Sequence, residues 1–318
     1  MQSCRYRIKN WPEYNKALIN RGNIIFWVET EALKRWSSSS HSCKPGRPEV
    51  YSCEAILLML ILRETFRLTL RSLEGFVTSV FSLMQIALKV PCYTQVSRRA
   101  KSLHKKIPKI NSKKGIKHLV FDSTGLKVFG EGEWKVRMHG KGKRRTWRKF
   151  HIGIDADTQE IVAFDLTTNS YGDAETAAAL LSSIDRKVGN VLGDGAYDGA
   201  AFRRVAYDIG ANCIVPPPKN ARYKKAEGGW ERKRDEVLAA IEGLGGGEKG
   251  RKLWKKLSGY HQRSLGETAF SRIKRLLGGS LKARTGDSQY TEALCKCLTI
   301  NKMNKFGMPK GFWEIAAA

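Results

Sequence analysis

The pattern of apolar and polar positions changes its period near residue 110, which divides the chain into a helical part and a part that mixes strands with helices. Residues 55–62 are apolar on every side and predict a central, buried helix that Ser52 can cap. Residues 69–80 repeat apolar positions at helical spacing, and residues 95–103 form a polar, arginine-rich stretch that also fits a helix. We therefore expect three helices between residues 49 and 110.

Beyond residue 110 the alternation of apolar positions predicts strands with helices between and after them. The expected strands are 117–122 with a partner at 126–130 across a Thr-Gly turn, 148–155, 161–167, 191–194 and 213–215. The expected helices are 173–184, 200–209, 234–241, 259–278 and 291–306. Apart from its one short helix, the Lys-, Arg- and Gly-rich stretch 219–258 predicts a flexible linker.

These elements group into three expected segments. Residues 1–48 predict a basic, weakly structured leader with a short helix around 27–36. Residues 49–110 predict a helical domain, and residues 111–318 predict an α/β domain whose last residues fray.

Basic residues far outnumber acidic ones, with 57 Lys and Arg against 30 Asp and Glu and a net charge of +27. Such an excess implies a polyanionic partner, either nucleic acid or an anionic membrane surface. The longest apolar run, residues 55–62, is too short to span a bilayer, so the membrane alternative is rejected. The seven cysteines show neither a CxxC pair nor a zinc-binding spacing, which favours a reducing cytoplasm.

The helical domain offers one candidate surface for nucleic acid. A buried helix, a turn and then an arginine-rich helix is the order found in a helix-turn-helix unit, in which Gln95, Arg98 and Arg99 would approach DNA. An ordinary three-helix bundle with a basic exposed face explains the same pattern equally well.

Carboxylates at the ends of two expected strands suggest a metal site. Asp122 ends the strand 117–122, and Asp194 ends the strand 191–194. Either residue alone is more often a turn-former or a helix cap. Together with a third carboxylate, however, they could converge on Mg²⁺, and two such ions could hold both the attacking and the leaving oxygen of a phosphoryl transfer. Asp155, Asp165 and Asp198 also lie near strand ends and compete for this role.

The third carboxylate lies on the expected helix 259–278. At about 100° per residue, Tyr260, Arg263 and Lys274 share a stripe with Glu267, while the other faces are apolar. Helix ion pairs on a solvated face would explain such a stripe. A metal site would explain in addition why the Glu has cations on both sides.

The spacing Tyr260-x2-Arg263-x3-Glu267-x6-Lys274 is similar to the Y-(2)-R-(3)-E-(6)-K signature of bacterial insertion-sequence DDE transposases. The segment DGAYD at 194–198 resembles their second-Asp motif, and Asp122 followed by Ser-Thr-Gly resembles the first. Further similarity runs through residues 144–151, 214–221 and 300–309, so the resemblance covers most of the chain beyond residue 45.

The resemblance implies a ribonuclease H-like catalytic domain at 111–318, a mixed sheet flanked by helices. It selects Asp122, Asp194 and Glu267 as catalytic metal ligands for Mg²⁺ or Mn²⁺, with two ions expected. The residues expected to contact DNA are Tyr260, Arg263, Lys274, Gln95, Arg98, Arg99, Arg144, Arg145, Arg148 and Lys149.

The expected activity is metal-dependent hydrolysis that frees 3′-OH groups at the ends of an insertion sequence, followed by strand transfer into target DNA. The expected partners are terminal inverted repeats, target DNA and a second copy in a dimer or higher multimer, in the bacterial cytoplasm near the nucleoid. A structure-specific nuclease and a non-catalytic DNA-binding protein remain as alternatives.

Overall fold

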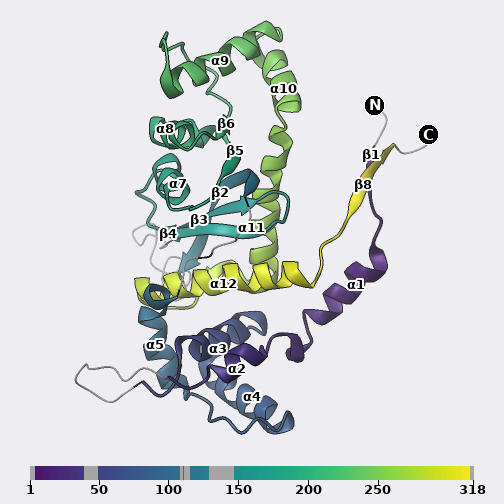
Figure 1. The fold of residues 1–318 in the computed structure, drawn as a ribbon, viewed down its shortest axis with the longest axis vertical. Helices are drawn as coiled ribbons and strands as arrows, with labels where there is room; N and C mark the ends of the chain where they lie inside the picture. Colours follow the sequence, from purple (N-terminus) through teal and green to yellow (C-terminus); the bar gives the residue numbers. More distant parts are fainter. Residues whose placement is uncertain (1–3, 39–48, 108–109, 111–114, 129–146, 316–318) are drawn as a thin grey trace, which may run out of the picture. The chain divides into compact units, whose positions relative to one another are not determined.

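The computed structural model describes residues 4–38, 49–107, 110, 115–128 and 147–315 (Figure 1). The chain forms two compact units. The first consists of residues 1–106 with 298–318, and the second of residues 107–297. Helix α12 (Gly286–Phe306) contributes residues to both units.

The first unit contains the three expected helices, α3 (Cys53–Thr65), α4 (Leu70–Leu83) and α5 (Tyr93–Lys106). The Ser52 side chain caps α3 by accepting a hydrogen bond from the Ala55 N–H at 3.0 Å, as predicted. The side chain of Thr69 caps α4 in the same way. The connection between α4 and α5, residues 84–92, is longer than the short turn typical of a helix-turn-helix unit.

The expectation of a weakly structured leader is wrong for the residues that the structure describes. Residues 4–34 contain four elements, β1 (Cys4–Ile8), α1 (Trp11–Asn20), η1 (Ile24–Phe26) and α2 (Thr30–Lys34). The strand β8 (Gly311–Ile315), where fraying was expected, pairs antiparallel with β1. A pairing between the two ends of the chain leaves no local pattern in the sequence, which is why it was missed.

The second unit is built on one mixed sheet with strand order β4-β3-β2-β5-β6. The strands are β2 (Ile116–Val128), β3 (Trp147–Asp155), β4 (Ile161–Thr167), β5 (Val188–Leu192) and β6 (Asn212–Ile214), with the short β7 (Ser280–Leu281) beside β2. β2, β3 and β4 are antiparallel, while β5 and β6 run parallel to β2. This order and these directions confirm the ribonuclease H-like fold.

One detail of the expected sheet is wrong. We predicted a strand, a Thr-Gly turn and a second strand from 117 to 130, but β2 continues without a turn and pairs with β3 from Leu119 to Lys127. Across this pairing the ring of Trp147 packs against Gly125, 3.1 Å from where a Cβ would lie. The glycine therefore accommodates the tryptophan of the neighbouring strand rather than forming a turn.

Side chains that alternate along β2 pack against different helices. Phe121 packs into a cluster with residues of α7 (Asp173–Ser182) and α8 (Ala200–Asp208), on one face of the sheet. Val120 packs on the other face against α9 (Gly229–Gly243) and α10 (Gly247–Leu257), through Ile241 and Trp254. Figure 1 shows α7 and α8 on one side of the sheet and α10 and α11 on the other.

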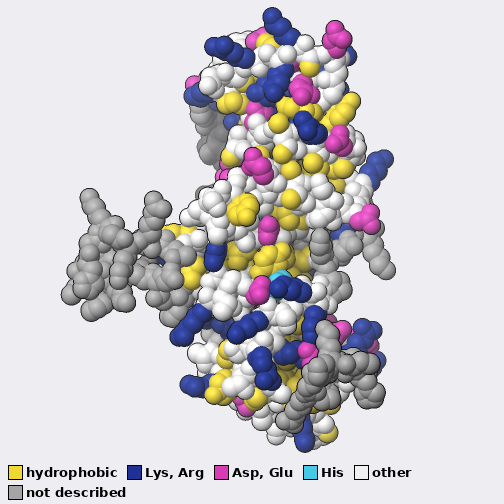
Figure 2. Space-filling model, turned by 90° about the vertical axis from the view of Figure 1, so that its left-hand side faces the viewer, with side chains coloured by type: hydrophobic (Ala, Val, Ile, Leu, Met, Phe, Trp, Pro, Cys, Tyr) yellow, Lys and Arg dark blue, Asp and Glu magenta, His cyan; other side chains and the backbone are white. Residues whose placement is uncertain are grey.

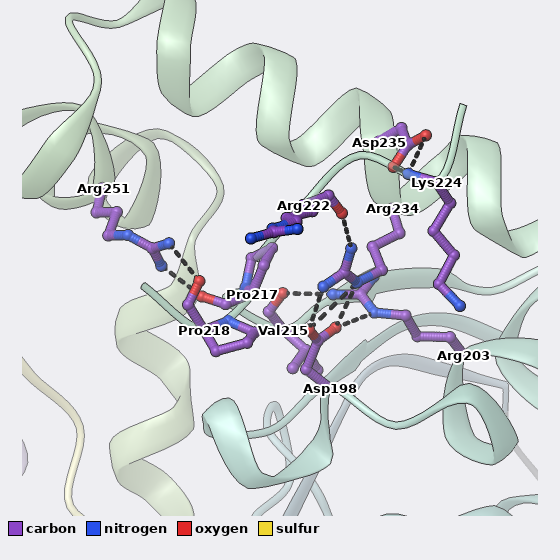
Figure 3. Close-up of polar contacts among 10 residues, drawn as sticks. All are labelled: Asp198, Arg203, Val215, Pro217, Pro218, Arg222, Lys224, Arg234, Asp235 and Arg251. Atoms are coloured by element: carbon purple, nitrogen blue, oxygen red, sulfur yellow. Dashed lines mark hydrogen bonds and ion pairs between the residues drawn. The ribbon is translucent and has the colours of Figure 1, made fainter. Parts of the chain in front are cut away.

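The stretch predicted as a flexible linker is folded into α9 and α10. Polar contacts help to hold it (Figure 3). Arg234 of α9 and Arg203 of α8 both form ion pairs with the buried Asp198, the first at 3.1 Å. Arg251 of α10 donates hydrogen bonds to the carbonyls of Pro217 and Pro218. Such contacts leave no apolar periodicity, so the pattern could not reveal them.

The expected helix 259–278 divides into a one-turn 3₁₀ helix, η3 (Tyr260–Arg263), and α11 (Ser264–Leu277). Gly278, with φ 87°, ends α11, as the glycine at this position predicted. The apolar side of α11 faces the sheet, with the ring of Phe270 5.8 Å from the ring of Phe150 on β3.

Candidate active site

Asp122 lies in the middle of β2 opposite Ile152, on the face of the sheet that α11 covers. Helix α11 comes very close here: a Cβ on Gly266 would lie 2.7 Å from Asp122 Cβ and 2.8 Å from its Oδ2. Burial raises the pKa of Asp122 to about 6, although the Ser123 N–H, which donates to Oδ1 at 2.9 Å, acts in the opposite direction. The site therefore contains a carboxyl whose charge is poorly compensated.

Asp194 is placed beside Asp122 by the register of two parallel strands. Val120 on β2 is paired with Leu192 on β5, and each aspartate follows two residues later on its own chain segment. Asp194 caps the one-turn helix η2 (Gly195–Tyr197) by accepting from the Ala196 N–H at 2.8 Å. Gly193 allows this turn to close, because a Cβ there would lie 2.7 Å from the ring of Tyr197.

Glu267 comes to the same place from the first turn of α11, one residue after Gly266. It is exposed and forms an i,i+4 ion pair with Arg263. The charges of Asp194 and Glu267 both raise the pKa of Asp122, whereas Arg263 lowers it. Two of the three carboxylates that the resemblance selected, Asp194 and Glu267, therefore act electrostatically on the third, Asp122.

Within the described part of the chain, no three His, Cys, Asp or Glu side chains have the geometry of a metal site. The donor set nevertheless suits a divalent cation, because it consists of hard carboxylate oxygens near one another, of which those of Asp122 are half-buried. Arg263, the cation that lowers the pKa of Asp122, is paired with Glu267. Asp122, Asp194 and Glu267 are the residues that would hold such an ion.

The other members of the expected stripe surround these carboxylates. Tyr260 is half-buried on η3, its ring 6.4 Å from that of Trp254 and under the Lys255 ammonium at 5.1 Å. Burial raises the pKa of Tyr260, and the charges of Asp194 and Glu267 raise it further. Lys274, two turns after Glu267, donates a hydrogen bond to Thr124 Oγ1 at 2.6 Å. The stripe thus extends along both sides of the carboxylates.

Three of the residues expected to contact DNA are bound to other parts of the protein. Arg148 donates to Gln289 at 2.9 Å, and Lys149 forms an ion pair with Asp173 at 2.8 Å. In the first unit Arg99 contacts the Tyr51 carbonyl and Glu49. On the same helix, Gln95 is half-buried and Arg98 is exposed. Arg144 and Arg145 lie outside the described residues.

A polar cluster on the opposite face of the sheet was not predicted from the sequence. His151 lies opposite Ser123 in the pairing of β2 and β3. Its Nε2 shares a hydrogen bond with Thr167 Oγ1 at 2.9 Å, and its Nδ1 lies 3.5 Å from Asp173 Oδ1. Among the described residues, His151 Nδ1, Asp173 Oδ1 and the Tyr197 hydroxyl are buried without a hydrogen-bond partner. Burial lowers the pKa of His151 and raises that of Tyr197. The cluster lies directly behind the carboxylates.

Gly266 is a second residue of the site that was missed. The available signal was a glycine next to Glu267 inside the expected helix, where glycine costs about 1 kcal/mol relative to alanine. The close approach of α11 to Asp122 explains why a residue without a Cβ is needed here despite that loss of helix stability.

Two family models, both described as transposase DDE domain, match this chain, one over residues 113–302 and the other over residues 19–131. Two solved structures are similar at low sequence identity. The piggyBac transposase synaptic complex with hairpin DNA has 11% identity and a TM-score of 0.43, covering 94% of this chain and 78% of that chain. The Drosophila P element transposase strand transfer complex has 10% identity and a TM-score of 0.28, covering 87% and 85%. No helix among the described residues is long and apolar enough to cross a membrane.

Proposed function

The chain belongs to the family of transposase DDE domains and has the function of a DNA transposase, and on this premise we propose that Asp122, Asp194 and Glu267 are its catalytic carboxylates. The observation that carries the assignment is geometric: the register of β2 and β5 puts Asp194 beside the half-buried Asp122, and α11 packs against Asp122 at Gly266, next to Glu267. Three elements from separate parts of the chain bring these charges together despite their repulsion. A bound cation would remove that repulsion.

The reaction we propose has two phosphoryl-transfer steps. In the first, water attacks a phosphorus atom at the end of the element, and the P–O bond to the 3′ oxygen breaks to leave a 3′-OH. In the second, this 3′-OH attacks target DNA and displaces another 3′ oxygen. Divalent cations, two ions of Mg²⁺ or Mn²⁺, would activate the attacking oxygen and stabilise the leaving oxygen when bound.

The residues around the carboxylates would position the DNA. The Lys274 ammonium would bind a phosphate as a single charge, and the planar Arg263 guanidinium would bind one through two N–H groups. Tyr260 would stack on the terminal nucleotide or form a hydrogen bond with it. The substrate is double-stranded DNA with terminal inverted repeats, in a bacterial cytoplasm. Because two ends have to be joined to one target, we propose that the protein acts as a dimer or higher multimer.

The test uses purified full-length protein and DNA that carries the inverted repeats flanking its own gene, with Mg²⁺ or Mn²⁺. Wild type should cleave and join this DNA, and Glu267→Gln should bind it without either reaction. Glu248→Gln, which removes an acid from the nearby helix α10, serves as the matched control and should remain active. Cleavage without joining would indicate a nuclease, and cleavage that persists in Glu267→Gln would refute the assignment.

A further inference from the structure

Helix α10 is the part of the chain that the sequence led us to treat as a linker, and it carries a charge pattern that the proposed function leaves unused. Its eleven residues contain five Lys or Arg and one acid, Glu248. On the face drawn in Figure 2, Lys and Arg side chains lie in several places among Asp and Glu side chains. A binding surface therefore has to be identified by which cations are exposed and lack an acidic partner.

The two sides of α10 differ in what they contact. Gly250 and Trp254 are buried, and Gly250 lies so close to α9 that a Cβ would be 2.2 Å from the Ile241 carbonyl oxygen. Trp254 packs with Val120 and Leu192 of the central strands. These contacts fix the helix on the sheet and determine which side faces solvent.

Lys249, Lys252 and Lys256 lie on the opposite side of α10, all exposed and within about 60° of one another around the helix axis. In the described part of the chain, none of the three forms an ion pair. We call these three residues the α10 lysine stripe. By contrast, the basic residues of α9 that are equally accessible are paired: Arg232 and Lys233 both form ion pairs with Glu236, at 3.6 Å and 2.9 Å.

The C-terminal end of α10 lies at the carboxylates. Lys255, one residue before the last lysine of the stripe, places its ammonium 5.1 Å from the centre of the Tyr260 ring. The charges of Asp122, Asp194 and Glu267 all act on Tyr260. Figure 1 shows α10 and α11 following each other along one side of the sheet. Because both helices bury their inner sides against that sheet, their outer sides face away from it together.

From this arrangement we propose that the α10 lysine stripe binds the phosphate backbone of the DNA whose terminal nucleotide lies at Tyr260. The stripe spans about 10 Å along the helix axis, roughly three steps of 3.4 Å along one DNA strand. It reads no base sequence, and its role is to hold the duplex next to the carboxylates. The proposal rests on the proposed function, because it takes the substrate from it.

Salt dependence of binding measures such contacts directly. Each phosphate contact makes the slope of log affinity against log salt concentration steeper by about 0.9. The triple variant Lys249→Gln/Lys252→Gln/Lys256→Gln should therefore have a slope that is shallower by about 2.7. The affinity difference from wild type should then be about 40-fold larger at 50 mM than at 200 mM salt. The probe is a fluorescein-labelled duplex of arbitrary sequence, measured by anisotropy without divalent metal so that no cleavage occurs.

Two further variants serve as controls. Arg232→Gln/Lys233→Gln removes exposed but paired cations and should leave the slope unchanged. Replacing the three lysines by arginine retains the charges and should restore the wild-type slope. An unchanged slope in the triple glutamine variant, or an equal loss per charge in the α9 control, would overturn the proposal. So would a change in sedimentation without a change in slope, which would make the stripe a contact between copies.

The outcome can be separated from that of the proposed function. If wild type cleaves and joins its own ends while the triple glutamine variant keeps the full slope, only the stripe proposal fails. If the stripe variant loses the slope but wild type neither cleaves nor joins, the stripe proposal stands and the assignment of catalytic carboxylates fails.

Discussion

The two aspartates Asp122 and Asp198 should respond in opposite ways to replacement by asparagine. Both lie beside the central sheet of the second unit, but their surroundings differ. Asp122 is desolvated, and the nearby carboxylates raise its pKa further, to about 6 from an ordinary 3.8. Asp198 has a side chain that is only 3% exposed, and two arginines pair with it. The negative charge of Asp122 therefore destabilises the folded protein without metal, whereas the charge of Asp198 is compensated by its two arginines.

The sign and size of the Asp122 effect follow from the pKa. Because folding raises the pKa of Asp122, ionisation of this residue destabilises the folded protein without metal. The loss of stability is absent below about pH 4, grows as the pH rises and is complete above about pH 6. A shift of about 2 units corresponds to about 3 kcal/mol, and solvent screening at this half-buried group reduces it to about 1 to 2 kcal/mol. Asp122→Asn should recover this amount at pH 7.5 and nothing at pH 4.

Asp198→Asn should instead destabilise the protein by about 3 to 5 kcal/mol at neutral pH, because it leaves two buried guanidinium groups without their carboxylate. The assay is denaturant unfolding of wild type and both variants in the presence of a chelator, at pH 4 and pH 7.5. The difference between variant and wild type removes the general effect of acid on the rest of the chain.

Adding Mg²⁺ supplies a second comparison in the same samples. A ligand that binds only the folded state raises stability by mass action, so wild type should gain stability with metal concentration while Asp122→Asn gains much less. If Asp122→Asn lowers stability at pH 7.5 without metal, or if it responds to Mg²⁺ as wild type does, the argument that Asp122 awaits a cation is refuted.

Two substitutions test how the carboxylates are positioned. Gly266→Ala should reduce the rate of DNA cleavage at least tenfold while DNA binding is retained, because the added Cβ would force α11 away from Asp122. Cleavage at the wild-type rate would mean that α11 and Asp122 are less closely packed than the 2.7 Å approach implies. Tyr197→Phe keeps the ring that packs on Gly193 and removes a buried hydroxyl without a partner in the described structure, so unfolding should show a gain of about 1 kcal/mol. A loss of stability in Tyr197→Phe would indicate that the hydroxyl is satisfied by the Ser123 side chain, which lowers its pKa.

Much of the second unit could be predicted because its elements have strong local patterns. The strands 148–155 and 161–167 alternate regularly, and both are confirmed as β3 and β4 to within one residue. The pattern failed where contacts rather than periodicity determine structure. Thr124-Gly125 looks like a turn but is held straight by nine residue pairs with β3. Helix α10 looks like a linker because its buried residues are a glycine and one tryptophan.

For the site, the family resemblance predicted three carboxylates, but the sequence could not show how they are brought together. The position of Asp194 beside Asp122 depends on the parallel register of β2 and β5, two strands that are far apart in the chain. The register cannot be read from either strand alone. The role of Gly266 likewise exists only in relation to a side chain on another element.

Asp194 and Asp198 show why environment has to decide between residues of the same type. Both belong to the segment DGAYD, and residue type and distance from the strand do not separate them. Asp198 turns inward and meets Arg203 and Arg234, so its oxygens already accept hydrogen bonds from guanidinium groups (Figure 3). A divalent cation would have to displace two buried cations to bind there, and each would then lose the carboxylate that pairs with it. In the described part of the chain, Asp194 accepts one backbone N–H on Oδ1 and acts on Asp122 as an added negative charge. A metal gains most where negative charges repel one another, and that condition favours Asp194 over Asp198 as the proposed ligand.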